Sequence, residues 1–422
     1  MKYQLILVGL NHKSAPIWLR EKFHSELDQT KCRLALMTGN GSGIREAVIL
    51  STCNRIEVYA LTYERKENTS TLLLTMLSDW GRTSVDELAK HAYTLNDEAA
   101  ASHLFAVASG LDSLVLGEQQ IQLQVRNAVK ISEEACASGR VLSELFHTAD
   151  RFATRLRKEI GLGFDGSSVS SAAISLLTSH CQKANSLLIV GAGKMITVAA
   201  DRLKATIHEI LITNRTPQRA EALAKCMSGI PWPFDEIPSA LERVDAVLTF
   251  TSSNEYVISA ADISLAIQKR SNRELILIDG SVPRNIDPQA AVISGVQLYN
   301  IDDLAPFAGK IPEHKILEAG LMIDQEVSKF STKFRSYQAN DTLKELHQLA
   351  ENIRQEELSR ALNRMAKFSN RQKEIIDVLT RRIINKLLYE PTACVKEHAG
   401  RGDGESFDLI IRELFAISKE NS

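Results

Sequence analysis

Short apolar runs separated by polar turns fill the N-terminal part of the chain, and their spacing predicts both strands and helices. Residues 3–9 and 47–50 are almost continuously apolar, as buried strands are, and residues 56–59 alternate apolar and polar side chains as a further strand does. Helical spacing occurs in the intervening and following segments, at residues 17–26, 31–37 and 72–80. Together with a strand near residues 91–95, this order predicts a small α+β sandwich.

A second pattern begins near residue 187, where apolar strands alternate with helical segments. Residues 187–190 form an apolar run that enters a glycine turn and then a helix. Further apolar runs of strand length occur at residues 209–213, 246–250, 275–278 and 296–300. Strands separated by helices predict a doubly wound, mostly parallel sheet of the Rossmann type.

Beyond residue 300 the strand signals end and the chain becomes helical. Long helices are predicted at residues 312–337, 343–367 and 371–389, followed by a short one at residues 407–417. Charge-rich helices without strands are more often scaffolding or an oligomer interface than a catalytic site. Between Ser359 and Lys386 there are eight Lys/Arg and two Asp/Glu, which fits either a phosphate-contacting face or a solvated one.

A glycine-rich break at residues 161–166 separates the first pattern from the second. We therefore predict an α/β multidomain protein with a ferredoxin-like α+β domain at residues 1–160, a Rossmann domain at residues 161–301 and a helical domain at residues 302–422. The length of 422 residues agrees with about three domains of ordinary size.

Composition excludes several classes of protein. With 44% apolar and 24% charged residues and a formal net charge of −2, nothing draws the whole chain to nucleic acid or to a membrane. The six cysteines show neither zinc-ligand spacing nor the density of a disulfide framework, so we expect free thiols in a reducing cytoplasm and no metal site. The apolar start lacks a cleavage site and no apolar run reaches ~18 residues, so we expect neither a signal peptide nor a membrane span.

The polar cluster Ser51-Thr52-Cys53-Asn54-Arg55 joins two of the predicted strands. A cysteine on a loop between strands is positioned and approachable, and a neighbouring arginine can lower its pKa and bind a carboxylate in two places. The alternative is a small buried hydrophobe in a β-turn, because free cysteine is among the most buried residue types. Chemistry elsewhere in the chain has to decide between the two.

Residues 98–130 combine small and amide side chains in a helical pattern. His103 lies in an Ala-rich segment, Ser113 and the run Glu118-Gln119-Gln120 follow an interruption, and Gln124 lies one turn beyond Gln120. A solvated helix would carry Lys and Glu here, so this composition indicates a polar pocket wall. The alternatives are a helix N-terminus capped by Ser113 with amides on its surface, and a structural rather than catalytic His103.

The turn Gly191-Ala192-Gly193-Lys194-Met195-Ile196 follows a predicted strand and precedes a helix, which is the context that a dinucleotide site requires. Gly191 permits the turn and Gly193 lets backbone N–H groups approach a pyrophosphate, although Ile196 replaces the third glycine of the fingerprint. The next strand ends at Asn214-Arg215-Thr216, where an NAD site would carry an acid. An arginine there suits the 2′-phosphate of NADP(H); the alternative is an ordinary surface arginine.

Six segments together resemble the glutamyl-tRNA reductase family. They occur in the family's order and with similar spacing, from the first strand to about residue 395. The segments are Gly9–Pro16, Ser51–Tyr59, Ala108–Glu118, Gly191–Met195, Asn214–Thr216 and Asn385–Leu388. The first and third are highly specific for the family, whereas a glycine turn alone is common.

The resemblance implies a catalytic N-terminal domain, an NADPH-binding Rossmann domain, and a long spinal helix leading to a helical domain for homodimerisation. It implies that Cys53 is the nucleophile and that His103 is needed for activity. Further substrate contacts implied by the matching motifs are Thr52, Asn54, Arg55, Ser113, Glu118, Gln119, Gln120 and Gln124. NADPH would be held by Gly191–Ile196 and Asn214–Thr216. The sequence departs from the family at Gln119, where many members have proline, and at Lys194, where many have an acid.

The implied activity is NADPH-dependent reduction of glutamyl-tRNA(Glu) to glutamate-1-semialdehyde, the first step of tetrapyrrole (5-aminolevulinate) biosynthesis. A thiolate suits the capture of an activated acyl ester, and the resulting thioester accepts hydride more readily than a carboxylate. Arg55 would bind a substrate carboxylate, and the family commonly passes its unstable product to an aminomutase. Because Cys53 must face a cofactor held by the second domain, we also expect domain closure.

Two alternatives remain at the level of sequence. A shikimate-dehydrogenase-like, NADP-dependent reductase of a small carbonyl compound also joins a Rossmann domain to an Asn-Arg-Thr turn, but it needs neither the thiol nor the helical C-terminus. A non-catalytic RNA-binding relative would retain the scaffold, but Cys53, Arg55, His103 and the glycine turn would then be expected to erode together, and all are present.

Overall fold

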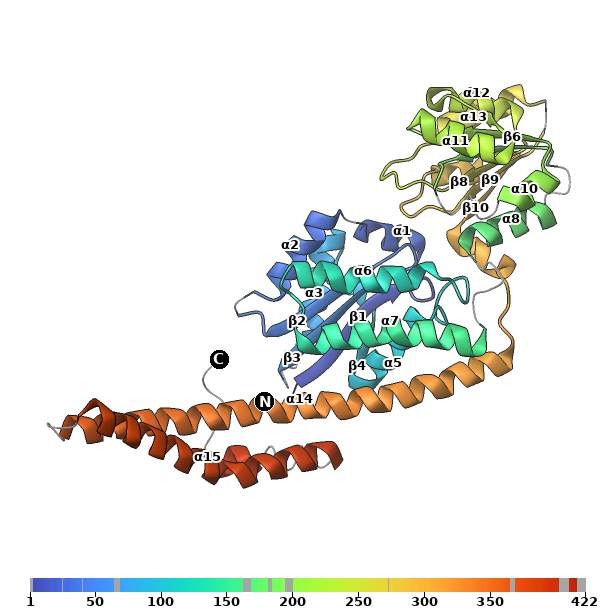
Figure 1. The fold of residues 1–422 in the computed structure, drawn as a ribbon. Coiled ribbons are helices and arrows are strands. Elements are labelled where there is room, and N and C mark those ends of the chain that lie inside the picture. Colours follow the sequence, from blue (N-terminus) through green and yellow to red (C-terminus); the bar gives the residue numbers. More distant parts are fainter. Residues whose placement is uncertain are drawn as a thin grey trace. The chain divides into compact units, whose positions relative to one another are not determined.

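The computed structural model describes residues 3–24, 26–39, 41–63, 69–161, 168–180, 184–193, 200–271, 273–364, 369–401 and 410–415. The chain divides into two compact units, each described separately below (Figure 1). The larger comprises Leu5–Ala60 and Glu67–Ile323, and the smaller comprises Asp324–Ser422 with two short N-terminal pieces. Within the described residues, no helix combines the length and the apolar character needed to cross a membrane.

The first sheet of the larger unit has four strands in the order β2-β3-β1-β4. The strands are β1 (Tyr3–Asn11), β2 (Ile44–Ser51), β3 (Arg55–Tyr63) and β4 (Tyr93–Asn96). β1 and β4 pair antiparallel, with Val8 opposite Thr94. Read from β4, this is the strand order of a ferredoxin-like fold, which confirms the predicted class.

Helices cover this sheet on both faces because its strands bury both alternating sets of side chains. Ile6 and Ile49 belong to a core with Leu34 of α2 and Leu77 of α3. On the other face, Tyr59 of β3 meets Phe146 of α7 edge-on, with ring centroids 5.1 Å apart. The helices are α1 (Ile17–Arg20), the 3₁₀ turn η1 (Glu21–Phe23), α2 (Leu27–Met37), α3 (Thr69–Gly81), α4 (Val85–Ala89), α5 (Asp97–Ala108), α6 (Gln120–Glu134) and α7 (Arg140–Ile160).

The second sheet of the larger unit has six strands in the order β10-β9-β8-β5-β6-β7, and every pair in it is parallel. The strands are β5 (Ser186–Val190), β6 (Glu209–Thr213), β7 (Ile230–Pro231), β8 (Ala246–Thr249), β9 (Leu275–Asp279) and β10 (Val296–Asn300). The chain runs outward from β5 to β7 and then returns to β8 on the other side of β5. This is the doubly wound Rossmann order, and β5 and β8 flank its topological switch point.

Alternate residues of β5 point to opposite layers of helices in this second domain. Leu187 and Ile189 pack in the core formed with α8, α10 and α11, whereas Leu188 and Val190 pack in the core formed with α12 and α13. These helices are α8 (Val169–His180), α10 (Ala200–Thr206), α11 (Pro217–Met227), α12 (Ile237–Arg243) and α13 (Ala260–Lys269). The 3₁₀ turns are η2 (Phe234–Glu236), η3 (Pro288–Val292) and η4 (Ile301–Phe307). A three-layer sandwich results, with its strand ends free to carry a ligand site.

The smaller unit is helical, as predicted, but its first helix is longer than the sequence pattern indicates. α14 runs unbroken over Glu313–Arg364, so the predicted interruption between residues 337 and 343 is wrong. That stretch contains neither glycine nor proline, and nothing in it ends a helix. α15 follows at Asn370–Arg401, and residues 410–414 are helical; the start of the predicted last helix lies outside the described residues.

α14 and α15 pack through a small apolar core in which Leu346, Leu388 and Val395 are buried. Arg354 of α14 also joins the two helices, because its Nη1 lies 2.6 Å from Asp377 Oδ1 of α15. The two helices therefore form a hairpin held by both apolar and charged contacts.

Candidate active site

Cys53 lies in the tight turn between β2 and β3, as the sequence predicts. The Thr52 hydroxyl accepts hydrogen bonds from the backbone N–H groups of Asn54 at 3.1 Å and Arg55 at 3.2 Å. The N–H of Thr52 donates to the carbonyl of Arg55 at 2.8 Å, which closes the turn. Arg20 adds a tertiary contact, since its Nη1 donates to the carbonyl of Cys53 at 2.9 Å. The turn is thus fixed by local and long-range bonds.

A cavity of about 600 Å³ places Cys53 opposite the carboxyl ends of the Rossmann strands. The side chains predicted for substrate and cofactor that line it are Cys53, Gln120, Gln124, Gly191, Ala192, Gly193, Asn214, Arg215 and Thr216. A second cavity of about 410 Å³ also reaches the turn, and its lining includes Thr52, Cys53, Arg55 and Gln124. Residues far apart in sequence therefore share one space around the thiol.

Of the other predicted substrate contacts, Ser113, Glu118 and Gln119 line neither cavity. Ser113 and Glu118 are buried, whereas Gln119 and Gln120 are exposed at the start of α6. The residue that caps α6 is Gln119, so the alternative of a helix capped by Ser113 is wrong. Lys194, Met195 and Ile196 lie outside the described residues.

Charges around the Cys53 thiol act in opposite directions. Burial and the carboxylate of Glu118 raise the pKa of Cys53, and Arg20 and Arg55 offset only part of this, so that the pKa reaches about 12. The expected lowering by a neighbouring arginine is present but is outweighed. Burial raises the pKa of Glu118 as well, to about 7, so this carboxyl group can gain or lose a proton near neutral pH.

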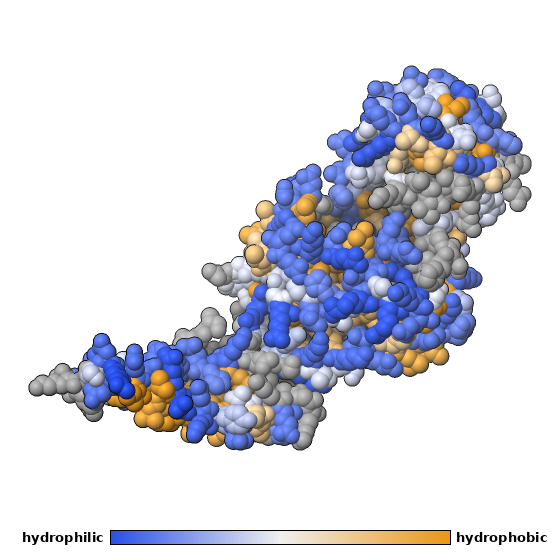
Figure 2. All heavy atoms as spheres, in the orientation of Figure 1, coloured by the Kyte–Doolittle hydropathy of each residue, from blue (hydrophilic) through white to orange (hydrophobic). Residues whose placement is uncertain are grey.

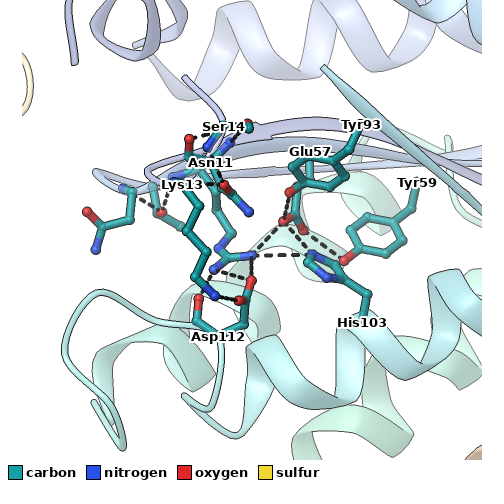
Figure 3. Close-up of polar contacts among 11 residues, drawn as sticks. Asn11, Lys13, Ser14, Glu57, Tyr59, Tyr93, His103 and Asp112 are labelled. Atoms are coloured by element: carbon teal, nitrogen blue, oxygen red, sulfur yellow. Dashed lines mark hydrogen bonds and ion pairs between the residues drawn. The ribbon is translucent and has the colours of Figure 1, made fainter. Parts of the chain in front are cut away.

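Arg55 is almost fully buried, at 1% exposure, and its guanidinium is bonded to two carboxylates of the protein itself. Nη1 donates to Glu57 Oε1 at 2.6 Å, and Nη2 donates to Asp112 Oδ2 at 3.1 Å and to the Asp112 carbonyl. Lys13 pairs with the same Asp112 (Figure 3). Arg55 therefore ties the Cys53 turn to the segment between α5 and α6.

Glu57 is the centre of a buried polar network on the face of the sheet that α5 and α7 cover. Its carboxylate accepts hydrogen bonds from the hydroxyls of Tyr93 at 2.6 Å and Tyr59 at 2.8 Å, and it contacts His103 Nε2 at 2.8 Å (Figure 3). Burial raises the pKa of Glu57, but Arg55, His103 and Tyr93 lower it by more, to about 2. The Glu57 carboxylate therefore stays ionised near neutral pH, and Arg55, Tyr59, Tyr93 and His103 all contact it.

Gly9 of β1 makes the space that Glu57 occupies. A Cβ at this position would lie 2.8 Å from Glu57 Cγ and 3.0 Å from the Ile56 carbonyl oxygen, closer than atoms normally approach. The following turn is also ordered, because Asn11 Oδ1 accepts the N–H groups of Lys13 at 2.9 Å and Ser14 at 3.1 Å. These contacts explain physically why the first motif of the chain belongs to the same site.

His103 reaches the Cys53 turn indirectly. Its Nε2 lies 2.8 Å from Glu57 Oε1 and 3.3 Å from Arg55 Nη1. Within the described residues, no hydrogen bond joins His103 to Cys53. The route from the histidine to the thiol turn passes through Glu57 and Arg55.

The cofactor end of the cavity fits a dinucleotide. Gly191 has φ +104°, and a Cβ there would lie 2.4 Å from the Phe250 carbonyl oxygen, so only glycine suits the turn. A Cβ at Gly193 would meet no atom within 4 Å, which leaves its backbone open to a ligand. Arg215 is exposed at the end of β6 and donates from Nη2 to Ser253 Oγ at 2.8 Å. A phosphate at this edge would meet both an arginine and backbone N–H groups.

Sequence reasoning missed the partners that hold the predicted residues. Glu57, Tyr93 and Asp112 complete the network around Arg55 and His103, and Arg20 holds the Cys53 carbonyl. The one local signal was an acid in the middle of a strand that is otherwise apolar at residues 56–61. On a sheet covered on both faces such an acid is buried and must find partners.

A ferredoxin-like domain that presents a cysteine to the switch point of a Rossmann domain defines a two-domain, nucleotide-dependent oxidoreductase. Comparison with known proteins narrows this class. Residues 8–160 match the model of the glutamyl-tRNA(Glu) reductase N-terminal domain, residues 175–307 that of shikimate/quinate 5-dehydrogenase, and residues 318–417 that of the glutamyl-tRNA(Glu) reductase dimerisation domain.

Full-length relatives support the same assignment. The chain is 36% identical over 422 residues to glutamyl-tRNA reductase of Syntrophotalea carbinolica, covering 99% of this chain and 95% of that protein. It is 36% identical over 434 residues to glutamyl-tRNA reductase of Chloroflexus aurantiacus, covering 98% and 99%. The solved glutamyl-tRNA reductase of Methanopyrus kandleri is 28% identical, with a TM-score of 0.50 over 96% of this chain and 99% of that one. The chain belongs to the glutamyl-tRNA reductase family.

Proposed function

We propose that this protein uses NADPH to reduce the glutamyl group of glutamyl-tRNA(Glu) to glutamate-1-semialdehyde through a thioester on Cys53, the first step of tetrapyrrole biosynthesis. The observation that carries the proposal is the shared cavity of about 600 Å³, which Cys53 lines together with Gly191, Gly193 and Arg215. A thioester formed on this sulfur faces the space in which a nicotinamide cofactor would be held.

Acyl transfer begins with the loss of the thiol proton. The Cys53 sulfur then forms a bond to the glutamyl carbonyl carbon, and the ester bond to the tRNA ribose breaks. Glu118 acts electrostatically on this thiol, and its pKa of about 7 suits it to accept the proton and return it to the departing ribose oxygen. When bound, NADPH supplies the hydride that reduces the thioester, which releases the aldehyde and leaves Cys53 as the thiolate.

The predicted substrate contacts differ in where they lie relative to the cavity. Gln120 and Gln124 line the cavity and offer amide groups to the glutamyl moiety. Asn54 Oδ1 is buried and has no hydrogen-bond partner among the described residues, and Asn54 lines neither cavity, so its contact with the substrate stays a prediction. Thr52 shapes the turn, and Ser113, Glu118 and Gln119 stay predicted contacts.

Arg55 and His103 act on the turn in our proposal. The Arg55 guanidinium is already bonded to Glu57 and Asp112, so its main role is to hold the turn rigid. A direct contact between Arg55 and a substrate carboxylate stays a prediction. His103 supports the same network through Glu57.

For the cofactor we propose that Gly191–Ile196 hold the pyrophosphate and that Asn214, Arg215 and Thr216 hold the 2′-phosphate of NADPH. Arg215 lines the cavity beside Gly193, which supports this assignment. The match to a dimerisation domain at residues 318–417 supports a homodimer formed through the C-terminal helices. Domains at residues 1–160, 161–301 and 302–422, a cytoplasmic location and hand-over of the product to an aminomutase complete the proposal.

The test is a reduction assay with purified glutamyl-tRNA(Glu) and NADPH. We expect NADPH oxidation in step with aldehyde formation, and we expect Cys53→Ser to lose at least about 10³-fold in rate. Cys32→Ser is the matched control, because Cys32 is an exposed free thiol that lines neither cavity. Full activity of Cys53→Ser, or reduction of dehydroshikimate in place of glutamyl-tRNA, would contradict the proposal.

A further inference from the structure

Two neighbouring residues of the ferredoxin-like domain form ion pairs with the Rossmann domain inside the larger unit. Arg20 Nη2 lies 2.5 Å from both carboxylate oxygens of Asp302 in the 3₁₀ turn η4. This turn begins at the predicted domain boundary, and its Ile301 and Leu304 pack in the core of the Rossmann domain. Glu21 Oε1 accepts from Arg284 Nη2 at 2.7 Å, and its Oε2 accepts from Arg284 Nε at 3.0 Å. Neither ion pair takes part in the proposed acyl transfer to Cys53 or in the reduction of the thioester.

Arg20 is built into the structure as a three-way connector. It is 4% exposed, and each guanidinium nitrogen serves a different segment. Nε donates to the Ala15 carbonyl at 3.1 Å, Nη1 to the Cys53 carbonyl at 2.9 Å, and Nη2 to Asp302. Because the guanidinium is planar and rigid, a displacement of Asp302 rotates the donor that holds the Cys53 carbonyl.

In the Glu21–Arg284 pair, Arg284 lies in a loop that is fixed by buried hydrogen bonds. Arg284 follows β9 in a loop anchored by Asp279, which is 1% exposed and accepts the N–H groups of Asn285 at 2.7 Å and Ile286 at 2.8 Å. Gly280, Ser281 and Val282 of this loop line the shared cavity. The loop therefore carries both a cavity wall and the cation that binds Glu21.

The two pairs have opposite polarity, and this makes them specific for one alignment of the domains. The ferredoxin-like domain contributes a cation followed by an anion, and the Rossmann domain contributes the complementary charges. Exchanging the partners would place Arg20 against Arg284 and Glu21 against Asp302, which like charges oppose. The favoured alignment is the one in which Cys53 and Gly191 line the same cavity.

On the basis of the proposed function, we propose that Arg20 is a positioning residue, which holds the Cys53 turn ready for reduction only while Arg20 is paired with Asp302. The Glu21–Arg284 pair selects the domain alignment in which Arg20 and Asp302 meet. Thioester formation needs only the substrate and residues of the ferredoxin-like domain. Hydride transfer needs the turn to face the Rossmann domain as well. The pair should therefore matter more for the second step than for the first.

The first test needs no substrate. Hydrogen exchange of the peptide that contains residues 52–55 is compared between wild type, Asp302→Asn and the matched control Asp303→Asn. Asp303 lies in the same turn, is exposed, and bonds only locally to the Asn300 N–H at 2.8 Å among its described contacts. We expect exchange to rise at least about fivefold in Asp302→Asn alone. Equal exchange in both variants would overturn the proposal.

The second test separates the two chemical steps. Labelled glutamyl-enzyme is formed without NADPH, and NADPH is then added in a single turnover. We expect Asp302→Asn to form the thioester within about twofold of wild type but to reduce it about tenfold or more slowly, with Asp303→Asn unchanged. Equal slowing of both steps would indicate a general structural defect and would overturn the proposed role. Failure of wild type to form a glutamyl adduct would instead defeat the proposed function, and the exchange test would still decide the role of Asp302.

A charge exchange tests the second pair. Glu21→Arg and Arg284→Glu each place like charges opposite one another, and we expect each to slow the reduction step about tenfold. The double variant restores an ion pair with reversed polarity, and we expect it to recover most of the rate. A double variant no faster than either single variant would contradict alignment by these charges.

Discussion

At the scale of single residues, the thiol of Cys53 is under two opposing influences. Burial and Glu118 hold its pKa at about 12, whereas Arg20 and Arg55 favour the thiolate. The thiol is therefore protonated at neutral pH until its proton is accepted by another group. The partly protonated Glu118, with its pKa of about 7, is the group whose charge acts most strongly on it.

Removing the charge of Glu118 should make Cys53 more reactive toward a small electrophile. We expect Glu118→Gln to lower the pKa of Cys53, and each unit of lowering raises the thiolate fraction about tenfold. The measurement is the rate of iodoacetamide alkylation of Cys53 from pH 7 to 10, located by peptide mapping. Transfer of the glutamyl group should slow in the same variant, because the proton acceptor is lost. Slower alkylation in Glu118→Gln would refute this account of the thiol.

Glu57 provides a prediction about stability and pH. Its pKa is about 2 in the folded protein against 4.5 for an ordinary glutamate, so it stabilises the fold fully above pH 4.5 and loses that contribution as the pH falls toward 2. We expect Glu57→Gln to cost on the order of 3 kcal/mol at pH 7, and the difference from wild type to shrink below pH 4.5. Urea dependence of hydrogen exchange in β3 measures this. Tyr59→Phe removes one donor to the same carboxylate, so it should cost less, on the order of 1.5 kcal/mol, over the same pH range. A cost of Glu57→Gln that stays constant below pH 4.5 would contradict the assignment.

At the scale of elements, the sequence pattern predicted strands and helices well where the periodicity was strong. The apolar runs at residues 187–190 and 209–213 are β5 and β6 within a residue of their predicted ends. The pattern failed at α14, because the mostly polar residues 338–342 were interpreted as a loop between two helices, whereas the helix continues through them. β7 was not predicted, because Ile230–Pro231 is too short to show a period.

The glycine turn after β5 allows a matched pair of substitutions. Gly191→Ala places a methyl group 2.4 Å from the Phe250 carbonyl oxygen at φ +104°, so we expect a loss of at least about 2 kcal/mol in stability. Gly193→Ala meets no neighbour within 4 Å, so we expect stability within about 0.5 kcal/mol of wild type but weaker NADPH binding. Thermal unfolding with and without NADPH measures both. Unchanged stabilisation of Gly193→Ala by NADPH would argue against a pyrophosphate at this turn.

Only the part of the site that depends on local spacing could be predicted from the sequence. Gln120 and Gln124 were expected to share a pocket wall because helical spacing places them on one face, and both line the cavity with Cys53. The pairing of His103 with Glu57 and of Arg20 with Asp302 depends on tertiary packing, and the latter joins residues 282 positions apart. No local pattern carries such information.

At the scale of the whole molecule, α15 carries an apolar stripe that the single chain leaves open. Ile375, Leu379, Ile383 and Leu387 recur every fourth residue and are between 55% and 68% exposed. Figure 2 shows apolar atoms gathered on the helical unit that contains α15. Because residues 318–417 match a dimerisation domain, we propose that a second copy of the chain covers this stripe.

A charge placed in the stripe should separate the dimer. We expect the double variant Ile383→Asp with Leu387→Asp to be a monomer by light scattering at concentrations where wild type is a dimer, because two carboxylates would have to be buried. Lys386→Asp changes an exposed neighbour on the same helix and should stay dimeric. A dimeric double variant would place the interface elsewhere.

In the proposed reaction, Cys53 captures the glutamyl group before any reduction takes place. The most direct measurement incubates the protein with labelled glutamyl-tRNA(Glu) in the absence of NADPH, quenches in acid, and maps the label by peptide mass spectrometry. The account predicts a glutamyl thioester on the peptide that contains Cys53, absent from Cys53→Ser and discharged as glutamate-1-semialdehyde when NADPH is added to the unquenched complex. Label on another residue, or aldehyde formed by Cys53→Ser at the wild-type rate, would contradict it.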